Sequence, residues 1–304
     1  MRVAAIDIGT NTTLLLVADR DDRGVLRAVR EEATITRLGQ GVDRTRRLAP
    51  EAVARTNACL VQYATIVREL GVERTAVVGT SAMRDASGAG GEEVLAKVRE
   101  LFGVEARTVS GEEEARLTFE GAVSGLDLPP DVTVFDIGGG STEIVVGAAG
   151  VVRASHSFDV GSVRLTERLV RSDPPTRAEL DGVTRAISDA FAENDVWRDA
   201  RGPVVGIAGT VTTLAAISLE LEPYDGARVH GLEMTVDDVR RVVDRLAALP
   251  LAERAKVRGL EPKRADVIVA GGLVALGVLA KLGATTLIVS DRGVRWGLAE
   301  TLAR

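Results

Sequence analysis

Two stretches of this sequence decide the fold: Asp7-Ile8-Gly9-Thr10-Asn11-Thr12 and Asp136-Ile137-Gly138-Gly139-Gly140-Ser141-Thr142-Glu143. Each follows one short apolar run and precedes another, which predicts two strands joined by a tight turn. Glycine lets the backbone approach an oxyanion closely, and successive N–H groups of such a turn form a nest that binds phosphate. Because the pattern occurs once in each half of the chain, it indicates two similar lobes that grip a phosphate.

Acidic residues flank both glycine turns. Asp7 and Asp136 each open a turn, and Glu143 closes the second one. Carboxylate oxygens are the protein ligands that Mg²⁺ uses beside a phosphate. The pattern therefore favours a divalent cation, Mg²⁺ or Mn²⁺, bound by Asp7, Asp136 and Glu143, over carboxylates that stand there by chance.

The composition is that of a globular protein with large aliphatic cores. The chain has 304 residues, of which 45% are hydrophobic and 3% aromatic, and a chain of this length suffices for roughly two domains. The net charge of −6 argues against a general nucleic-acid or membrane-surface binder. We expect a cytoplasmic protein, because the N-terminus leads directly into a strand, no apolar run reaches the roughly 18 residues of a membrane span, and Cys59 is the single cysteine.

Three strands followed by alternating helices and strands are predicted twice along the chain. The first half has strands near residues 2–8, 13–19, 25–33, 74–78 and 105–108, and helices at 50–70, at 92–102 and from 110 onwards. The second half has strands near 132–137, 143–147, 150–157, 204–207 and 285–289, and helices at 162–170, 176–194, 236–248 and 264–282 and from 210 and 293 onwards. Each half is predicted to form a mixed sheet flanked by helices, with the ligand in a cleft between the halves.

Two further segments offer groups that bind phosphate. Gly206-Ile207-Ala208-Gly209-Thr210 ends a strand and opens a helix, and a helix N-terminus attracts anions. Gly209 and Thr210 are therefore candidates for a third wall of the phosphate site, with a simple helix entry as the alternative. Arg84 follows a strand end and is expected on a loop, where its guanidinium suits a bidentate phosphate contact or is merely solvated.

Three consecutive glutamates at 112–114 follow Ser110 at the beginning of a predicted helix. Acidic residues in a first turn complement the helix dipole behind a serine cap, and local chemistry alone favours this structural role. The alternative is that one of them serves as a general base for water, with a pKa raised by the neighbouring carboxylates and bound phosphate.

Together these motifs resemble the exopolyphosphatase/guanosine pentaphosphate phosphohydrolase (Ppx/GppA) family in its short two-domain form. The resemblance spans nearly the whole chain and rests on DIGTNT (7–12), TSAMRDA (80–86), SGEEEAR (110–116), FDIGGGSTE (135–143), GSVRLTE (161–167), GIAGT (206–210) and RADVIVAGG (264–272). It implies an α/β fold of the actin, sugar-kinase and heat-shock-ATPase superfamily, with two duplicated ribonuclease-H-like domains and an interdomain cleft. The implied domains are residues 1–124 and 125–304, with the terminal helix 293–304 packing back on the first.

The resemblance also implies roles for residues that match the family motifs. It makes Glu114 the catalytic base, places Arg84 beside the reacting phosphate, and leaves Glu112 and Glu113 as helix-end charges. It assigns Asp136 and Glu143 to metal and water. The residues expected to contact phosphate are Asn11, Thr12, Gly138, Gly139, Gly140 and Ser141.

The activity implied by the resemblance is metal-dependent hydrolysis of the terminal phosphate of inorganic polyphosphate. The close alternative is removal of the 5′-phosphate of guanosine pentaphosphate (pppGpp) by the same residues. Two more distant alternatives are a phosphotransferase of the same fold and a polyphosphate or alarmone sensor without turnover. Regulation by guanosine tetraphosphate (ppGpp) and formation of a homodimer are left open.

Overall fold

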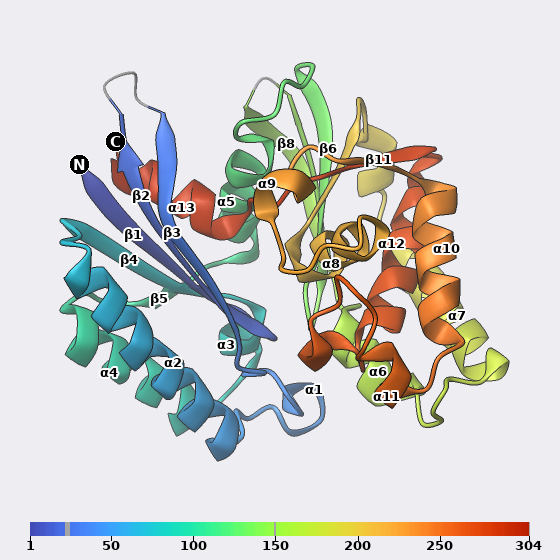
Figure 1. The fold of residues 1–304 in the computed structure, drawn as a ribbon, viewed down its shortest axis with the longest axis horizontal. Coiled ribbons are helices and arrows are strands. Elements are labelled where there is room, and N and C mark those ends of the chain that lie inside the picture. Colours follow the sequence, from blue (N-terminus) through green and yellow to red (C-terminus); the bar gives the residue numbers. More distant parts are fainter. Residues whose placement is uncertain (22–24, 149, 304) are drawn as a thin grey trace. The chain divides into compact units, whose positions relative to one another are not determined.

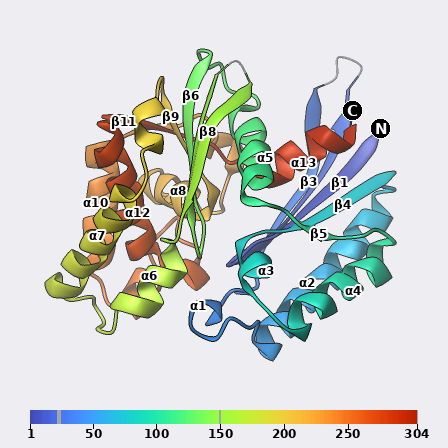
Figure 2. The ribbon, with the colours of Figure 1, turned by 180° about the vertical axis from the view of Figure 1, so that it is seen from behind.

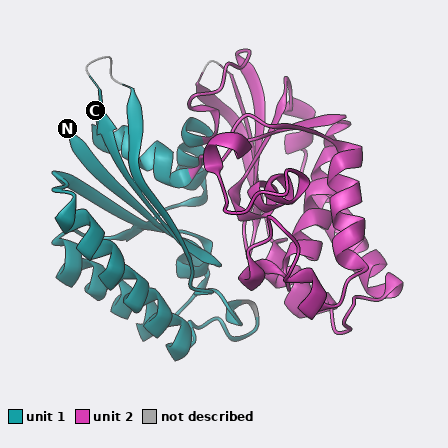
Figure 3. Cartoon of the chain, in the orientation of Figure 1, with its two compact units in different colours: residues 1–121, 294–304 teal, residues 122–293 magenta. Residues whose placement is uncertain are grey.

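The computed structural model describes residues 1–21, 25–148 and 150–303, except for the side chain of Asp43. The chain divides into two compact units (Figure 3): unit 1 comprises residues 1–121 and 294–304, and unit 2 comprises residues 122–293. The chain thus leaves unit 1 after Gly121, slightly before the division expected after residue 124. Residues 294–304 belong to unit 1.

Unit 1 is built on a five-stranded mixed sheet with the strand order β3-β2-β1-β4-β5 (Figure 1). The strands are β1 (Arg2–Ile8), β2 (Thr12–Arg20), β3 (Leu26–Ile35), β4 (Arg74–Gly79) and β5 (Arg107–Thr108). Strand β1 pairs antiparallel with β2 and parallel with β4. The helices are α1 (Val42–Thr45), α2 (Pro50–Glu69), α3 (Ser81–Asp85), α4 (Ala89–Phe102), α5 (Gly111–Val123) and α13 (Val294–Ala303).

The sheet of unit 1 is covered on both faces. Side chains alternate between the two faces of a strand, so Ala4, Ile6 and Ile8 of β1 pack with apolar residues of α2 and α4. Val3 and Ala5 point to the other face and pack with apolar residues of α13. The C-terminal helix therefore completes the core of unit 1.

Unit 2 is built on a six-stranded mixed sheet with the strand order β10-β11-β9-β6-β7-β8. The strands are β6 (Asp131–Ile137), β7 (Thr142–Ala148), β8 (Val151–Phe158), β9 (Val204–Ile207), β10 (Glu233–Thr235) and β11 (Thr286–Val289). The helices are α6 (Ser162–Leu169), α7 (Arg177–Ala192), α8 (Ala208–Ser218), α9 (Gly226–Val229), α10 (Val236–Ala247), α11 (Leu251–Arg254) and α12 (Ile268–Leu282). The apolar helix α12 packs against α6, α7, α8 and α10.

The two sheets have the same topology. Strand β6 pairs antiparallel with β7 and parallel with β9, just as β1 pairs with β2 and β4. The order β8-β7-β6-β9-β11 therefore repeats β3-β2-β1-β4-β5, and β10 adds one strand at the edge of unit 2. This duplication confirms the expected fold class, an α/β protein of two ribonuclease-H-like units.

Most strands and helix ends lie within two residues of the expected bounds, and the larger differences are short segments and helix beginnings. Helices α1, α3, α9 and α11 and strand β10 were not expected; none exceeds five residues, which is too short to show a hydrophobic period. Helix α4 begins at Ala89, three residues before the expected start at 92, and α12 begins at Ile268 instead of 264. Within the described ranges, no helix is both long and apolar enough to cross a membrane.

Helices α5 and α13 lie side by side in both views of the ribbon (Figures 1 and 2). Their backbones touch at Gly297 of α13, where any side chain would overlap the carbonyl oxygen of Leu117 in α5. An L-residue at position 297 would push the two helices apart. The position of α5 in unit 1 therefore depends on a glycine in the C-terminal helix.

Candidate active site

The two glycine turns share one hydrogen-bond pattern. In turn 1, residues 9–12 between β1 and β2, the Gly9 N–H donates to the carbonyl of Thr12 over 3.1 Å. In turn 2, residues 138–141 between β6 and β7, the Gly138 N–H donates to the carbonyl of Ser141 over 3.0 Å. The duplication of the two units therefore extends to the individual bonds of these turns.

Turn 2 is held by the first residues of α6. The Ser162 N–H and Oγ both donate to the carbonyl of Gly138, at 3.0 and 3.2 Å. The N–H groups of Val163 and Arg164 donate to the carbonyl of Gly139 at 2.9 and 3.0 Å. The first N–H groups of α6, which have no partner within the helix, thus donate to the carbonyls of turn 2. The Gly139 and Gly140 N–H groups of turn 2 donate to no backbone carbonyl in the described part of the chain, which leaves them suited to an anion.

The close approach of α6 to turn 2 requires a glycine at position 161. A Cβ there would lie 2.5 Å from the Gly139 carbonyl oxygen and 2.6 Å from the carbonyl carbon of Gly140. Both distances are too short for non-bonded heavy atoms. The sequence shows the glycine and the helix start that follows it, but not that its packing partner is turn 2.

Asp136 and Glu143 stand directly opposite each other in the β6–β7 pairing. Directly paired residues share one face of the sheet with their Cβ atoms about 4.5–5.5 Å apart. Glu143 is only 4% exposed, and its Oε1 accepts a hydrogen bond of 2.6 Å from Ser157 Oγ. Ser157 is the partner of Glu143 on β8, so the three side chains form a row across the sheet. Like charges in such a row repel, and a divalent cation would remove that repulsion.

The donor set in unit 2 fits Mg²⁺. This cation is usually held by one or two protein carboxylates and completes its shell with water and substrate phosphate. Asp136 and Glu143 supply two carboxylates, whereas Asp7 belongs to unit 1. Among the described residues, no group of three or more His, Cys, Asp or Glu side chains could hold a metal ion by itself.

Asp7 occupies the position in turn 1 that Asp136 occupies in turn 2. Its side chain is 8% exposed, and its Oδ1 is buried without a hydrogen-bond partner among the described residues. Burial raises the pKa of Asp7 to about 7, and the positive charge of Arg295 opposes this rise. Arg295 itself forms an ion pair of 2.6 Å with Glu31 of β3. A buried carboxylate oxygen in this state is the kind of atom that a bound cation or water satisfies.

Turn 1 carries three polar side chains, Thr10, Asn11 and Thr12, and the last two are the ones expected to contact phosphate. Asn11 is 7% exposed and its Oδ1 has no hydrogen-bond partner in the described part of the chain. The Asn11 carbonyl accepts the N–H groups of Thr36 and Arg37 at 3.1 and 2.9 Å. Its backbone is therefore fixed by the segment after β3, while its amide is available for a ligand.

Glu114 and Arg84 are brought together in unit 1. The Glu114 Oε2 accepts a hydrogen bond of 2.7 Å from Arg84 Nη1, and Glu114 is 7% exposed. Arg84 also donates to the carbonyl of Val109 at 3.2 Å. Arg84 lies on the short helix α3 and not on the loop expected from the sequence, because the chain turns into a helix immediately after β4.

The three glutamates at the start of α5 have three different surroundings. Glu112 is exposed. Glu113 pairs with Arg107, and this pairing lowers the pKa of the Glu113 carboxyl group. The Glu113 N–H donates to Ser110 Oγ at 3.2 Å, as expected for a serine that caps the helix. Of the three, Glu114 is the buried carboxylate with a cationic neighbour, which is the environment of a catalytic group.

The third glycine turn, residues 206–210 at the junction of β9 and α8, contains a strained residue. Ala208 has a φ of +66°, a left-handed conformation that costs an L-residue about 1 kcal/mol. Helix α8 begins there, two positions before the expected start at Thr210. Thr210 is 5% exposed, and the guanidinium of Arg264 occupies the space that a side chain at Gly209 would need. The approach of Arg264 is missed by sequence reasoning, because it joins segments more than fifty residues apart.

Comparisons with known proteins agree over the whole chain. Exopolyphosphatase 2 of Mycobacterium tuberculosis is 41% identical over 317 aligned residues, which cover 99% of this chain and 98% of that protein. A solved exopolyphosphatase-like protein has a TM-score of 0.91 and 33% identity, and the match covers 100% of this chain and 99% of that one. A solved member of the Ppx/GppA family from Aquifex aeolicus has a TM-score of 0.83 and 35% identity, over 99% of this chain and 97% of that one.

The family itself is shown by one further match. The model of the Ppx/GppA phosphatase family matches residues 16–303, a range that contains turn 2, both residues of the Arg84–Glu114 pair and the third glycine turn. The chain therefore belongs to the Ppx/GppA phosphatase family of hydrolases.

Proposed function

We propose that this protein is a metal-dependent exopolyphosphatase, which releases the terminal phosphate of inorganic polyphosphate by hydrolysis. The observation that carries the proposal is the buried Glu114 carboxylate with Arg84 at 2.7 Å. The names of relatives support the choice of substrate, since Exopolyphosphatase 2 of Mycobacterium tuberculosis is 41% identical. Polyphosphate is a linear anion, and the candidate site is rich in groups that bind phosphate.

The terminal phosphate is bound by backbone and hydroxyl donors. In unit 2 these are the Gly139 and Gly140 N–H groups and the Ser141 hydroxyl of turn 2, with Gly209 and Thr210 of the third turn, while the Gly138 N–H holds turn 2 closed through the Ser141 carbonyl. In unit 1 they are the side chains of Asn11 and Thr12. Pre-positioned donors of this kind stabilise the charge on a transferring phosphoryl group without reorganisation during the reaction.

Asp136 and Glu143 would hold the divalent cation. A bound Mg²⁺ or Mn²⁺ supplies charge neutralisation for phosphate oxygens and for the leaving chain. Ser157 orients Glu143 through its 2.6 Å hydrogen bond, so that one carboxylate oxygen is fixed by the protein. Asp7 is a third candidate carboxylate, because its Oδ1 lacks a protein partner in the described residues.

Glu114 is the general base. Its carboxylate accepts a proton from the attacking water, while the bond between the terminal phosphorus and the bridging oxygen breaks and the shortened chain departs. Arg84 holds the Glu114 carboxylate in place through the 2.7 Å hydrogen bond from its Nη1. A planar guanidinium also suits simultaneous contact with a carboxylate and a phosphate, so Arg84 links the base to the substrate.

The substrate is tested by measuring phosphate release with Mg²⁺ from polyphosphate and from guanosine pentaphosphate in parallel. The proposal predicts a higher kcat/KM on polyphosphate. A higher value on the nucleotide would make the protein a guanosine pentaphosphate phosphohydrolase that uses the same residues. Transfer of phosphate to ADP would indicate a phosphotransferase, and binding without turnover would indicate a sensor.

Replacing Glu114 by Gln should reduce kcat for phosphate release by about 10²- to 10⁴-fold, because the amide cannot accept the proton from water. The matched control is Glu112→Gln, which changes an exposed glutamate two positions away in the same helix. Circular dichroism should show that both variants are folded. Wild-type turnover by a folded Glu114→Gln protein would remove this residue from the role of base.

Mg²⁺ should raise the melting temperature of the wild-type protein, since a ligand at about 100 times its Kd stabilises the folded state by about 2.7 kcal/mol. Asp136→Asn and Glu143→Gln should abolish this response. In EDTA, Asp136→Asn should instead stabilise the protein by about 0.5 kcal/mol, because it relieves the repulsion with Glu143. Glu233→Gln, at an exposed residue of β10, serves as the control. An unchanged Mg²⁺ response in both site variants would refute the assignment.

Gly161→Ala should lower kcat/KM for phosphate release by about 10- to 100-fold, because the new methyl group displaces turn 2 and small misplacements of a binding group are costly. Gly182→Ala in α7 of the same unit is the control, since its Cβ would meet only Arg185, at 4.0 Å. Steady-state kinetics and melting curves of both variants make the comparison. Equal kcat/KM values in the two variants would show that turn 2 does not depend on Gly161.

A further inference from the structure

The loop between β3 and α2 carries an unusual local charge. Residues 37–47, here called the arginine loop, contain four arginines (37, 44, 46 and 47) and one aspartate (43), which is a net charge of +3 in a chain of net charge −6. Helix α1 forms the middle of this loop. The positive charge is therefore concentrated on one short segment of unit 1.

The arginine loop is fastened at its start to turn 1. The Gly39 N–H donates to the carbonyl of Thr10 at 2.8 Å, and the Arg37 N–H donates to the carbonyl of Asn11 at 2.9 Å. Position 39 has room for no side chain, because a Cβ there would meet Ala82 of α3 at 3.2 Å and would overlap Thr10. The loop thus begins between the candidate phosphate turn and the helix that carries Arg84.

The far end of the loop is fastened to the segment after α3. The N–H and Oγ of Ser87 both donate to the carbonyl of Arg46, at 2.8 and 3.0 Å. The Arg46 N–H donates to the carbonyl of Val42 at 2.7 Å, and Arg46 has a left-handed φ of +55°. A strained residue persists only where its surroundings determine the conformation. The loop is therefore a defined platform and not a solvated tail.

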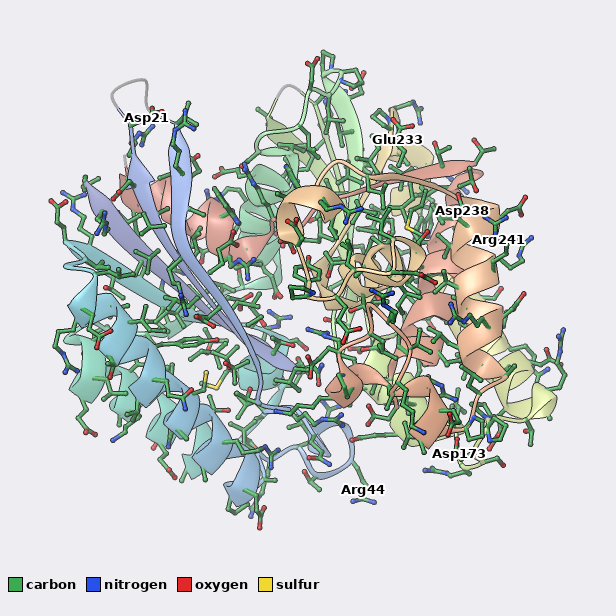
Figure 4. All side chains as sticks on the ribbon, viewed as in Figure 1. Asp21, Arg44, Asp173, Glu233, Asp238 and Arg241 are labelled. Carbon is green, nitrogen blue, oxygen red and sulfur yellow. The ribbon has the colours of Figure 1, made fainter. Side chains whose placement is uncertain are left out.

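Arg44, Arg46 and Arg47 present their charges without acidic partners. Their side chains are exposed, and within the described part of the chain none makes an ion pair or a side-chain hydrogen bond. Arginines elsewhere on the surface are commonly paired, for example Arg177 with Asp181 at 3.0 Å and Arg241 with Asp238. Figure 4 shows Arg44 extending from the loop away from the ribbon, whereas Arg241 lies beside Asp238. Three unpaired like charges on one platform repel each other, and a polyanion would remove that repulsion.

We propose that Arg44, Arg46 and Arg47 bind internal phosphates of a polyphosphate chain whose terminal phosphate contacts Asn11 and Thr12 of turn 1. This inference rests on the proposed exopolyphosphatase function and adds to it a surface that selects long chains. Arginine binds phosphate oxygens through charge-assisted hydrogen bonds, and each phosphate that it neutralises releases condensed counterions. A short substrate such as tripolyphosphate has a single internal phosphate and cannot engage all three arginines at once, so the arginine loop discriminates by chain length.

The test measures equilibrium binding of long-chain polyphosphate and of tripolyphosphate to the full chain carrying Glu114→Gln, which slows turnover enough for a binding measurement. In this background, the triple change Arg44→Gln, Arg46→Gln and Arg47→Gln should weaken binding of the long chain about tenfold or more. A plot of the logarithm of its binding constant against the logarithm of salt concentration should become less steep by about 2. Tripolyphosphate binding should change much less. The triple Arg→Lys variant should keep most of the long-chain affinity, because it keeps the charge.

The matched control is the pair Arg240→Gln and Arg241→Gln, which removes two exposed arginines of α10 that pair with Asp237 and Asp238. This control should bind both substrates like the parent. An unchanged long-chain affinity in the triple Gln variant, or an equal loss for both substrates, would overturn the inference and leave the proposed function standing. A parent protein that binds no polyphosphate of either length would contradict the proposed function itself.

Discussion

Turn 2 and the start of α6 lie so close together that only a glycine fits between them. A Cβ at Gly161 would be 2.5 Å from the Gly139 carbonyl oxygen, and the same approach lets three N–H groups of α6 reach the carbonyls of turn 2. Unit 1 uses the same device, because Gly297 of α13 lies against the backbone of α5. One contact fixes turn 2, which we propose binds phosphate, and the other fixes the helix that carries Glu114. The positions of the other candidate site residues depend on these two backbone contacts.

The buried carboxylates of both units are the second feature on which the candidate site depends. Asp136, Glu143 and Ser157 form a row across β6, β7 and β8, in which two carboxylates face each other at a cost that a cation would remove. At the equivalent place of unit 1, burial raises the pKa of Asp7 to about 7. Because this carboxyl group binds a proton more tightly in the folded protein than in the unfolded chain, its ionisation costs stability as the pH rises towards 7. Both units therefore keep carboxylates in places where a positive charge favours folding, which is the environment expected of metal ligands.

Much of the fold could be predicted from the sequence because its signals are local. The duplicated strand–turn–strand pattern and the long helices appear in the chain as apolar periods and glycine turns. The short elements α1, α3 and β10 were not predicted, because a helix of four or five residues or a strand of three shows no hydrophobic periodicity. The beginning of α4 was misplaced because Ala89, Gly90 and Gly91 carry no helix-start signal.

The candidate site could be predicted only in part from the sequence, because many of its contacts join distant segments. The local chemistry of residues 112–114 favours a helix-dipole role for all three glutamates, and only the family resemblance singled out Glu114. Its burial and its contact with Arg84 join residues thirty positions apart, so they follow from the way that α3 and α5 pack. Ser157 beside Glu143, Arg264 over Gly209 and the attachment of the arginine loop to turn 1 likewise depend on strand register and tertiary contacts. Sequence patterns name the groups that can bind phosphate, and the fold decides which of them meet.

The central claim, attack of water on the terminal phosphorus of polyphosphate, is tested most directly by running the reaction in water labelled with heavy oxygen. The account predicts that each released phosphate carries one labelled oxygen and that the shortened chain carries none, because the bond to the terminal phosphorus is the one that breaks. Label in the shortened chain, or release of unlabelled phosphate, would contradict hydrolysis at the terminal phosphorus.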